Sequence, residues 1–206
     1  MRALQRALAR AGYTVHNRGY DSRHHPIPVL ADHVAREIRS LTADAATVHM
    51  VTHSMGGILV RQMESTRPLA KLGRVVMLSP PNHGSEVVDR IGHTWIFDKV
   101  NGPAGKQLGT APDSFVNQLG PVRFECGIIT GDRSINWINS CIIPGPDDGK
   151  VSVESARVDG MTAFKVVHAN HAFITSNKRV ITEVIRFLKT GMGCPHPGRL
   201  DPYGGE

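Results

Sequence analysis

The chain has 206 residues, of which 40% are hydrophobic and 20% charged, and its formal net charge at pH 7 is +6. This length and composition allow one good hydrophobic core, which excludes a disordered or fibrous protein and predicts a single domain. No apolar run approaches the about 20 residues that cross a bilayer, and the first residues lack the apolar centre of a signal peptide, so the chain as given is expected to be cytoplasmic.

The positive charge is concentrated at the start of the chain, where the first forty residues hold seven Arg and three acidic residues. Arg2, Arg6 and Arg10 recur every four residues, opposite Leu4 and Leu8. This spacing favours the solvated face of an amphipathic helix over a patch that binds nucleic acid or an anionic membrane. No nucleic-acid partner is therefore expected.

Neither a metal nor a structural disulfide is expected. The three cysteines, Cys126, Cys141 and Cys194, cannot all pair with one another and lack the spacing of a zinc site. His168 and His171 are three residues apart, but no third ligand accompanies them at useful spacing.

The first elements are predicted to be helix, short strand and helix. Residues 2–11 have the amphipathic spacing of a helix that ends at Gly12, and residues 13–16 alternate like a short strand. After a loop rich in Gly, His and Pro, a second helix is predicted from apolar residues at helical spacing: Leu30, Val34, Ile38 and Leu41.

Residues 46–58 carry the strongest functional signal. An apolar, β-branched run leads to Ser54, and helical spacing resumes at Ile58, which predicts strand, sharp turn and helix. A serine on such a turn has its hydroxyl pushed out above the strand ends, and the next backbone N–H, that of Met55, points towards any carbonyl the oxygen attacks. We therefore interpret Ser54 as a nucleophile and Met55 as one oxyanion donor.

This stretch resembles the nucleophile elbow of the α/β-hydrolase superfamily, in particular its bacterial lipase-like and esterase-like branch; its residues are Val51-Thr52-His53-Ser54-Met55-Gly56-Gly57. Thr52 stands where the motif G-x-S-x-G begins with Gly. The resemblance covers about residues 1–190 and implies a mostly parallel sheet with helices on both faces. It also implies hydrolysis of a small-molecule or lipid ester, with no cofactor.

The middle of the chain fits this architecture. Residues 73–79 form a nearly continuous apolar run, as in a parallel strand covered on both faces. The turn at residues 80–85 follows this strand, where α/β sheets bind ligands, and its His83 is an alternative catalytic base. Residues 91–121 have little periodicity and predict an irregular cap or lid. Three aromatic residues there could form an acyl-binding wall or pack beneath the loop: Trp95, Phe97 and Phe115.

The candidate acid follows the next predicted strand, over residues 122–130. Asp148 lies on a glycine-bent loop before an apolar alternation, beside Asp147. This segment resembles the D-G-x-V motif that carries the triad acid in lipase-like α/β-hydrolases. Asp132 also follows a strand and is the competing acid, but no such motif follows it.

The candidate base lies between the last strand, predicted over residues 162–167, and a strongly amphipathic final helix. His171 occupies the place where the superfamily keeps its base, and His168 is the alternative. The order Ser54, Asp148, His171 is the nucleophile, acid, base order of α/β-hydrolases. His171 would take the serine proton, and Asp148 would orient the ring and stabilise the imidazolium, which leads to an acyl-enzyme.

The chain departs from the family in its oxyanion site. The second donor normally comes from a loop marked by His-Gly, after a strand that precedes the first helix, and no such strand precedes Arg2. That strand would lie between residues 13–16 and the elbow strand, so these two must pair directly or one leaves an apolar edge unpaired. We therefore expect an N-terminally truncated α/β-hydrolase, from a shortened gene product or a start codon assigned too far downstream.

This departure also sets the alternative function, a catalytically impaired or inactive remnant that lacks half of its oxyanion hole. The hydrolase domain is expected over residues 1–190. A disordered tail is expected over residues 191–206, which are rich in Gly and Pro. The sequence does not distinguish a lipase from an esterase, and it predicts neither acyl chain length nor oligomeric state.

Overall fold

The computed structural model describes residues 1–92 and 102–192 of the chain. Within them, four parallel strands form one sheet in the order β1-β2-β3-β4. The strands are β1 (Val48–His53), β2 (Leu72–Leu78), β3 (Cys126–Gly131) and β4 (Ala163–Val167). Because every strand runs in the same direction, their carboxyl ends meet at one edge of the sheet, where the functional residues were predicted.

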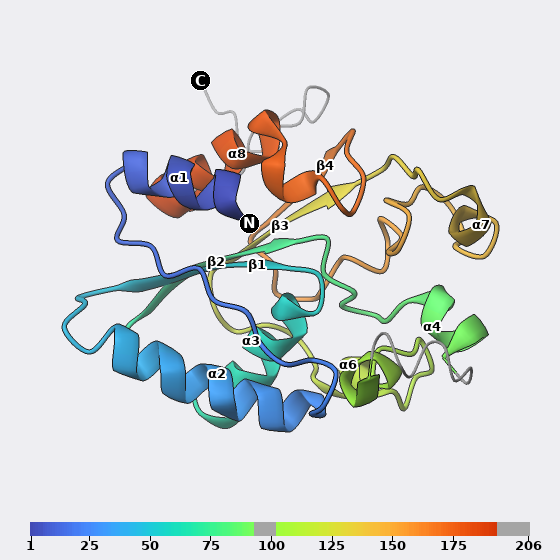
Figure 1. Cartoon of the computed structure of the whole chain (residues 1–206), viewed down its shortest axis with the longest axis horizontal. Helices are drawn as coiled ribbons and strands as arrows, with labels where there is room; N and C mark the ends of the chain where they lie inside the picture. Colours follow the sequence, from blue (N-terminus) through green and yellow to red (C-terminus); the bar gives the residue numbers. More distant parts are fainter. Residues whose placement is uncertain (93–101, 193–206) are drawn as a thin grey trace, which may run out of the picture.

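Helices cover both faces of this sheet (Figure 1). One face carries α2 (Ile27–Leu41) and α3 (Gly56–Thr66), and the other carries α1 (Arg2–Arg10) and α8 (Lys178–Thr190). This is the predicted α/β class with a mostly parallel sheet, and that prediction is confirmed.

β2 shows why the strands are apolar along their whole length. Its side chains point alternately to the two faces. Val75 and Met77 pack with α2 and α3, whereas Val76 and Leu78 pack with α1 and α8. All four are fully buried, because the sheet has a helical layer on each side.

Short elements lie beyond the carboxyl ends of the strands or in the connections near them (Figure 1). They are α4 (Glu86–Ile91), α6 (Phe115–Gln118), α7 (Trp137–Ser140) and the 3-10 turn η1 (Ile174–Ser176). The final helix α8 begins at Asn177, whose side chain accepts hydrogen bonds from Arg179 and Val180 N–H, and ends at Gly191 with a φ of 73°. Gly191 is the predicted helix end.

The strand predicted over residues 13–16 is not formed, and that prediction is wrong. The alternation is real, since Tyr13 and Val15 are half-buried against the α1 and α8 layer, while Thr14 and His16 are exposed. It serves side-chain packing only, with the Tyr13 ring edge-on to His49 at 5.9 Å. In the described part of the chain, β1 pairs with β2 alone, so its other edge is unpaired.

Other boundaries also shift. The third strand begins at Cys126 and not at residue 122. Residues 93–101 of the predicted lid, with Trp95 and Phe97, lie outside the described residues, whereas Phe115 packs against the core. The predicted tail falls outside the described residues from residue 193 onward.

The described cysteines, buried Cys126 and exposed Cys141, are free thiols. Across residues 1–92 and 102–192, no helix is both long enough and apolar enough to cross a membrane.

Candidate active site

Ser54 follows β1 directly, at the carboxyl edge of the sheet. The parallel ladder continues one step past the strand, because Ser54 N–H donates to the Leu78 carbonyl at 2.8 Å. Ser54 has a φ of 55°, in the left-handed region that non-glycine residues rarely occupy. The chain turns sharply there and enters α3 at Gly56. Strained backbone of this kind is typical of functional sites, and here it sets the serine hydroxyl above the strand ends.

The two glycines of the motif allow this tight turn. A Cβ on Gly57 would lie 3.0 Å from Pro80 Cβ and 3.1 Å from Met77 Sδ, too close without a shift of the neighbouring strand end. A Cβ on Gly56 would lie 3.2 Å from Thr52 Cβ. The larger residue at the first motif position is therefore accommodated because Gly56 opposite it has no side chain.

His171 brings Ser54 and Asp148 together. Its Nε2 lies 3.0 Å from Ser54 Oγ, and its Nδ1 lies 2.7 Å from Asp148 Oδ2. The carboxylate accepts only, so Nδ1 carries the hydrogen and Nε2 is left to accept the serine O–H. The backbone N–H of His171 also donates to the Asp148 carbonyl at 2.8 Å, which ties the two loops together. The three predicted residues form one chain of hydrogen bonds.

Asp148 is held as an anion in a buried place. It is 1% exposed, and its Oδ1 accepts the backbone N–H groups of Lys150 at 3.0 Å and Val151 at 2.9 Å. Burial alone would raise its pKa. The hydrogen bond and charge of His171 and the N–H of Val151 outweigh burial, so the pKa lies below its ordinary value of 3.8. A charged Asp148 can therefore stabilise a positive His171.

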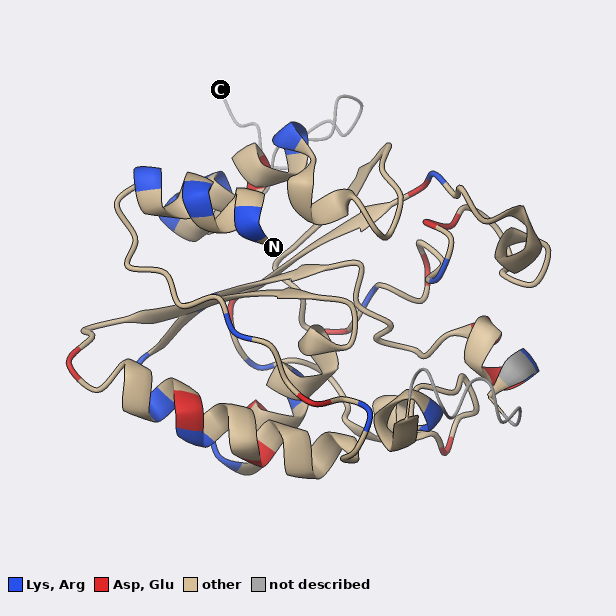
Figure 2. Cartoon of the chain, viewed as in Figure 1, with Lys and Arg blue, Asp and Glu red and all other residues tan. Residues whose placement is uncertain are grey.

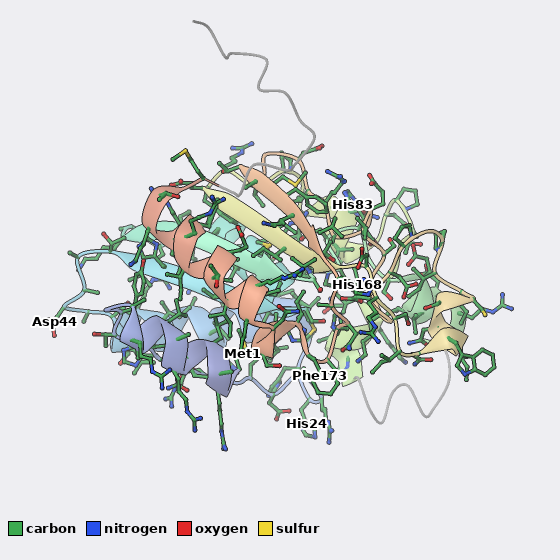
Figure 3. The ribbon with its side chains drawn as sticks, turned by 90° about the horizontal axis from the view of Figure 1, so that it is seen from above. Met1, His24, Asp44, His83, His168 and Phe173 are labelled. Atoms are coloured by element: carbon green, nitrogen blue, oxygen red, sulfur yellow. The ribbon has the colours of Figure 1, made fainter. Side chains whose placement is uncertain are left out.

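The alternative residues lie in other interactions. His168 Nδ1 lies 3.0 Å from Asp132 Oδ1, and both side chains are exposed. His83 Nδ1 lies 2.9 Å from the side-chain oxygen of Asn117. Figure 3 shows His83 and His168 toward the same end of the molecule, away from Asp44. In the described residues, neither histidine has a hydrogen bond to Ser54.

Asp147, the neighbour of the candidate acid, shapes the loop. Its Oδ1 accepts from the Gly149 N–H at 2.6 Å and from Ser140 Oγ at 3.0 Å. It is buried, and its side chain bonds to its own loop and to α7, whereas His171 bonds to Asp148.

His53 belongs to this site, although sequence analysis assigned it no role. Its Nε2 donates to the His171 carbonyl at 3.0 Å, and the two rings lie 4.7 Å apart, tilted by 43°. Burial, and next the charge of His171, lowers the pKa of His53 to about 4. A neutral ring at neutral pH fits this contact, because a second positive charge would oppose an imidazolium on His171.

Arg61 is a second residue that sequence reasoning missed. It lies on α3, is buried, and donates to the carbonyls of Asn82 at 2.8 Å, Val116 at 3.1 Å and Gly120 at 2.8 Å. Burial lowers its pKa to about 10, so it stays charged at neutral pH. It joins the elbow helix to the turn after β2 and to the segment around α6, both expected to border the cleft.

Oxyanion donors are the remaining part of the site. The Met55 backbone N–H has no hydrogen-bond acceptor among the described residues, so it is free for an incoming group. From the loop before α2, the Tyr20 hydroxyl approaches the elbow and would lie 3.6 Å from a Cβ on Gly56. Burial raises the pKa of Tyr20 to about 12, so this hydroxyl keeps its proton.

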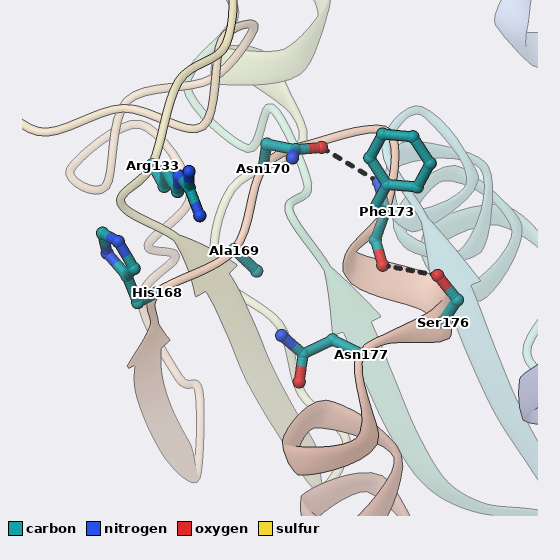
Figure 4. A pocket seen from close by; sticks show the side chains of 7 residues that line it. All are labelled: Arg133, His168, Ala169, Asn170, Phe173, Ser176 and Asn177. Carbon is teal, nitrogen blue, oxygen red and sulfur yellow. Dashed lines mark hydrogen bonds between the residues drawn. The ribbon is translucent and has the colours of Figure 1, made fainter.

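A shallow hollow of about 210 Å³ lies beside the loop that carries His171 (Figure 4). The Asn170 side-chain oxygen accepts from the Phe173 N–H at 3.1 Å and Ser176 Oγ donates to the Phe173 carbonyl at 2.9 Å, which fixes the bend after His171. The lining residues are Arg133, His168, Ala169, Asn170, Phe173, Ser176 and Asn177. No group of three His, Cys, Asp or Glu suited to a metal occurs in the parts of the chain that the structure describes.

Residues 1–172 match the model of the alpha/beta hydrolase family. The sequence has no match among curated proteins.

Solved structures with a similar fold include three lipid-cleaving enzymes by name. The mature lipase BlEst2 of Bacillus licheniformis has a TM-score of 0.64 and 17% identity, over 79% of this chain and 74% of the lipase. Phospholipase PlaB of Legionella pneumophila, in complex with thio-NAD, has a TM-score of 0.70 and 16% identity, over 91% of this chain and 55% of PlaB. The monoacylglycerol lipase of Paleococcus ferrophilus has a TM-score of 0.51 and 16% identity, over 92% of this chain and 88% of the lipase. At these identities the likeness concerns the fold.

Proposed function

Because this chain belongs to the alpha/beta hydrolase family, we propose that it is a serine hydrolase that cleaves carboxylic esters through an acyl-enzyme. The observation that carries the proposal is the hydrogen-bonded series from Ser54 Oγ through both ring nitrogens of His171 to the buried carboxylate of Asp148. A serine hydroxyl is a poor nucleophile until a base takes its proton, and this series supplies the base and its orienting acid.

The proposed reaction has two halves, acylation of Ser54 and hydrolysis of the acyl-enzyme, and the same three side chains act in both. Ser54 Oγ attacks the ester carbonyl while its proton passes to His171 Nε2, and the Met55 N–H donates to the oxyanion. His171 then protonates the leaving alkoxide, and the acyl group stays on Ser54. In the second half His171 deprotonates a water molecule that attacks the acyl-enzyme, and the proton returns to Ser54. Asp148 keeps its charge throughout and stabilises the imidazolium.

The substrate is proposed to be a small-molecule or lipid ester, in keeping with lipases and a phospholipase among the structures of similar fold. The alternative of an inactive remnant is less favoured, because the serine, the base and the acid keep hydrogen-bond distances and the Met55 N–H is open.

Labelling with a fluorophosphonate tests the proposal. The folded chain should be labelled at one serine, and Ser54→Ala should abolish the label. Ser40→Ala, on the exposed face of α2, is the matched control and should label like the parent. Absence of labelling in chain shown to be folded by circular dichroism, or labelling that persists in Ser54→Ala, would reject the nucleophile.

A further inference from the structure

Two helices on one face of the sheet, α1 and α8, carry an unbalanced charge, and we call them the basic layer. Together they contain seven Lys or Arg and one acidic residue, Glu183, which is an excess of six positive charges. The formal net charge of the whole chain is also +6, so the remaining residues are balanced in sign. Figure 2 shows Lys and Arg on both helices. The net positive charge of the protein is therefore concentrated on this layer.

The carboxylates of this region keep their charge but are matched by cations. Glu183 lies 2.8 Å from Lys165 Nζ and 3.6 Å from Arg186 Nε. Glu125, near the C-terminal end of α8, lies 2.8 Å from Arg74 Nε. Lys165 and Arg74 lie outside the two helices, so they balance these two acids without drawing on the other cations of the basic layer.

The cations of α1 and of the start of α8 are exposed. They are Arg2, Arg6, Arg10, Lys178 and Arg179, and none forms an ion pair within the described residues. The three arginines of α1 recur every four residues, a spacing at which like charges repel, and α1 has no acidic residue to relieve this. An ordinary solvated surface mixes both signs. On α1 alone the spacing is that of a solvated face, but the structure adds the cations of α8 beside it.

A groove of about 410 Å³ lies between the two helices. No acidic residue lines it. Its lining combines three cations with apolar side chains: Arg6, Arg10, Lys178, Ala3, Ala7 and Ile181. A ligand in this groove would therefore meet positive charge and apolar surface together.

This combination fits an anionic lipid better than a nucleic acid. A lipid headgroup places its phosphate directly above acyl chains, so cations beside apolar side chains can contact both parts. Single-stranded nucleic acids stack their bases on exposed aromatic rings, but the one aromatic residue of the two helices, Phe187, is buried. Both helices lie along the sheet, with Leu4, Leu8 and Val184 in the core, so neither projects as a DNA-recognition helix does (Figure 1).

The basic layer borders the candidate active site. The chain runs from His171 through η1 directly into α8, whose first residue is Lys178. η1 also contacts α1, because its Ile174 packs in one cluster with Leu4 and Leu8. A bilayer that binds the basic layer is therefore brought next to the loop that carries the proposed base.

We propose that the basic layer is a docking surface for lipid bilayers that carry anionic headgroups. Arg6, Arg10 and Lys178 meet the headgroup phosphates, and Arg2 and Arg179 add to the attraction. The apolar faces of both helices stay packed on the sheet, so binding is electrostatic and salt weakens it. Docking does not depend on catalysis; only the idea that the bilayer also supplies the substrate rests on the proposed function.

Vesicle flotation tests this surface in the Ser54→Ala background, so that no lipid is cleaved. At about 0.1 M salt the chain should float with phosphatidylcholine vesicles that contain about one third phosphatidylglycerol. It should float much less with phosphatidylcholine alone or at about 1 M salt. The triple variant Arg6→Gln, Arg10→Gln, Lys178→Gln should lose about 100-fold in partitioning, because each cation at an anionic surface contributes on the order of fivefold.

A matched control removes the same amount of charge elsewhere. Arg23→Gln, Arg36→Gln, Arg123→Gln changes three exposed arginines that lie outside α1 and α8 and form no ion pair within the described residues. Both triple variants lower the formal net charge by three, so they differ only in where the charge is lost. The control should float within about threefold of its parent.

Three flotation results would overturn the docking surface. They are failure of the parent to float, equal loss in the control variant, and undiminished flotation of the variant at Arg6, Arg10 and Lys178. Fluorescence anisotropy with a DNA duplex adds a fourth. Duplex binding that this variant abolishes, in a chain that does not float, would assign the basic layer to nucleic acid.

The outcome is separable from that of the proposed function. In chain that keeps Ser54, the variant at Arg6, Arg10 and Lys178 should still be labelled by fluorophosphonate and should hydrolyse a water-soluble ester at the parent rate. Flotation without labelling rejects the hydrolase alone, and labelling without flotation rejects the docking surface alone.

Discussion

At the scale of single residues, we expect His53 to position His171, the proposed base, without transferring a proton itself. Its Nε2–H must stay on the ring to donate to the His171 carbonyl, and a pKa of about 4 keeps the ring neutral where a histidine base works. It directly precedes Ser54 in the chain, so it joins the turn after β1 to the loop that carries His171.

His53→Phe keeps a flat ring but removes this donor, so we expect kcat on a soluble ester to fall about tenfold while KM changes little, because the defect concerns the base and not substrate binding. His53→Gln can still donate from its amide and should recover part of kcat. Steady-state kinetics of both variants check this. Equal losses in the two variants, or a loss that lies in KM, would contradict a positioning role.

The choice of acid is tested by a matched pair. Asp148→Asn should lower kcat by about 10³ to 10⁴, because an amide can favour the wrong tautomer of His171 and cannot stabilise its charge. Asp132→Asn breaks an exposed pair with His168 and should leave kcat within about twofold. Initial rates on the same ester compare the two, and the reverse ranking would make Asp132 the acid.

The sequence predicted Ser54, Asp148 and His171 because each stands in a motif with a local shape. It could not predict His53, whose partner is 118 residues away. The local sequence does not show whether the side chain of His53 points toward His171 or toward solvent. The path of the loop after β4 determines that contact. Arg61 was missed for the same reason, since its acceptors are carbonyls on segments that come later in the chain.

At the scale of elements, long apolar runs were the reliable signal and short alternations were not. β2 was predicted within one residue because both its faces are buried and the whole run is apolar. Residues 13–16 carry the alternation of a strand, yet a strand needs a partner, and local pattern does not say whether one lies alongside. The alternation there reflects side-chain packing on the α1 and α8 side of the sheet, not pairing with a strand.

At Gly57, in the first turn of α3, we predict that an added methyl group destabilises the protein. Gly57→Ala improves helix propensity by about 1 kcal/mol, but its methyl would press on Pro80 and Met77, and overpacking of this kind costs about 1–3 kcal/mol. We expect a net loss of about 1 kcal/mol in the free energy of unfolding, measured by urea denaturation. Gly19→Ala, with no atom within 4 Å of the added methyl, is the control and should change little. If the Gly57→Ala protein is more stable than the parent, the added methyl group fits beside Pro80 and Met77 without overpacking.

At the scale of the whole molecule, the candidate site ties stability to pH through two groups. The pKa of Asp148 is lowered on folding, so its contribution is present above the unfolded value of 3.8 and is lost as pH falls through the lower folded value. The pKa of His53 falls from 6.5 to about 4, so between these values the unfolded chain binds the extra proton. Stability therefore decreases as pH falls across both windows, His53 acting in the upper one and Asp148 in the lower.

His53→Gln separates the two windows. In the parent chain, His53 should account for a loss on the order of 3 kcal/mol in the free energy of unfolding between pH 6.5 and pH 4. Burial is the main cause of the lowered pKa of His53, and the charge of His171 is the next. Asp148 raises this pKa and Lys150 lowers it. A glutamine does not titrate, so the variant should show a flatter curve from pH 6.5 to 4 and the same steep fall below it, where Asp148 still titrates. Urea denaturation across this range measures both slopes. If the two curves stay parallel down to pH 4, the buried ring is protonated at its ordinary pKa and does not constrain the fold.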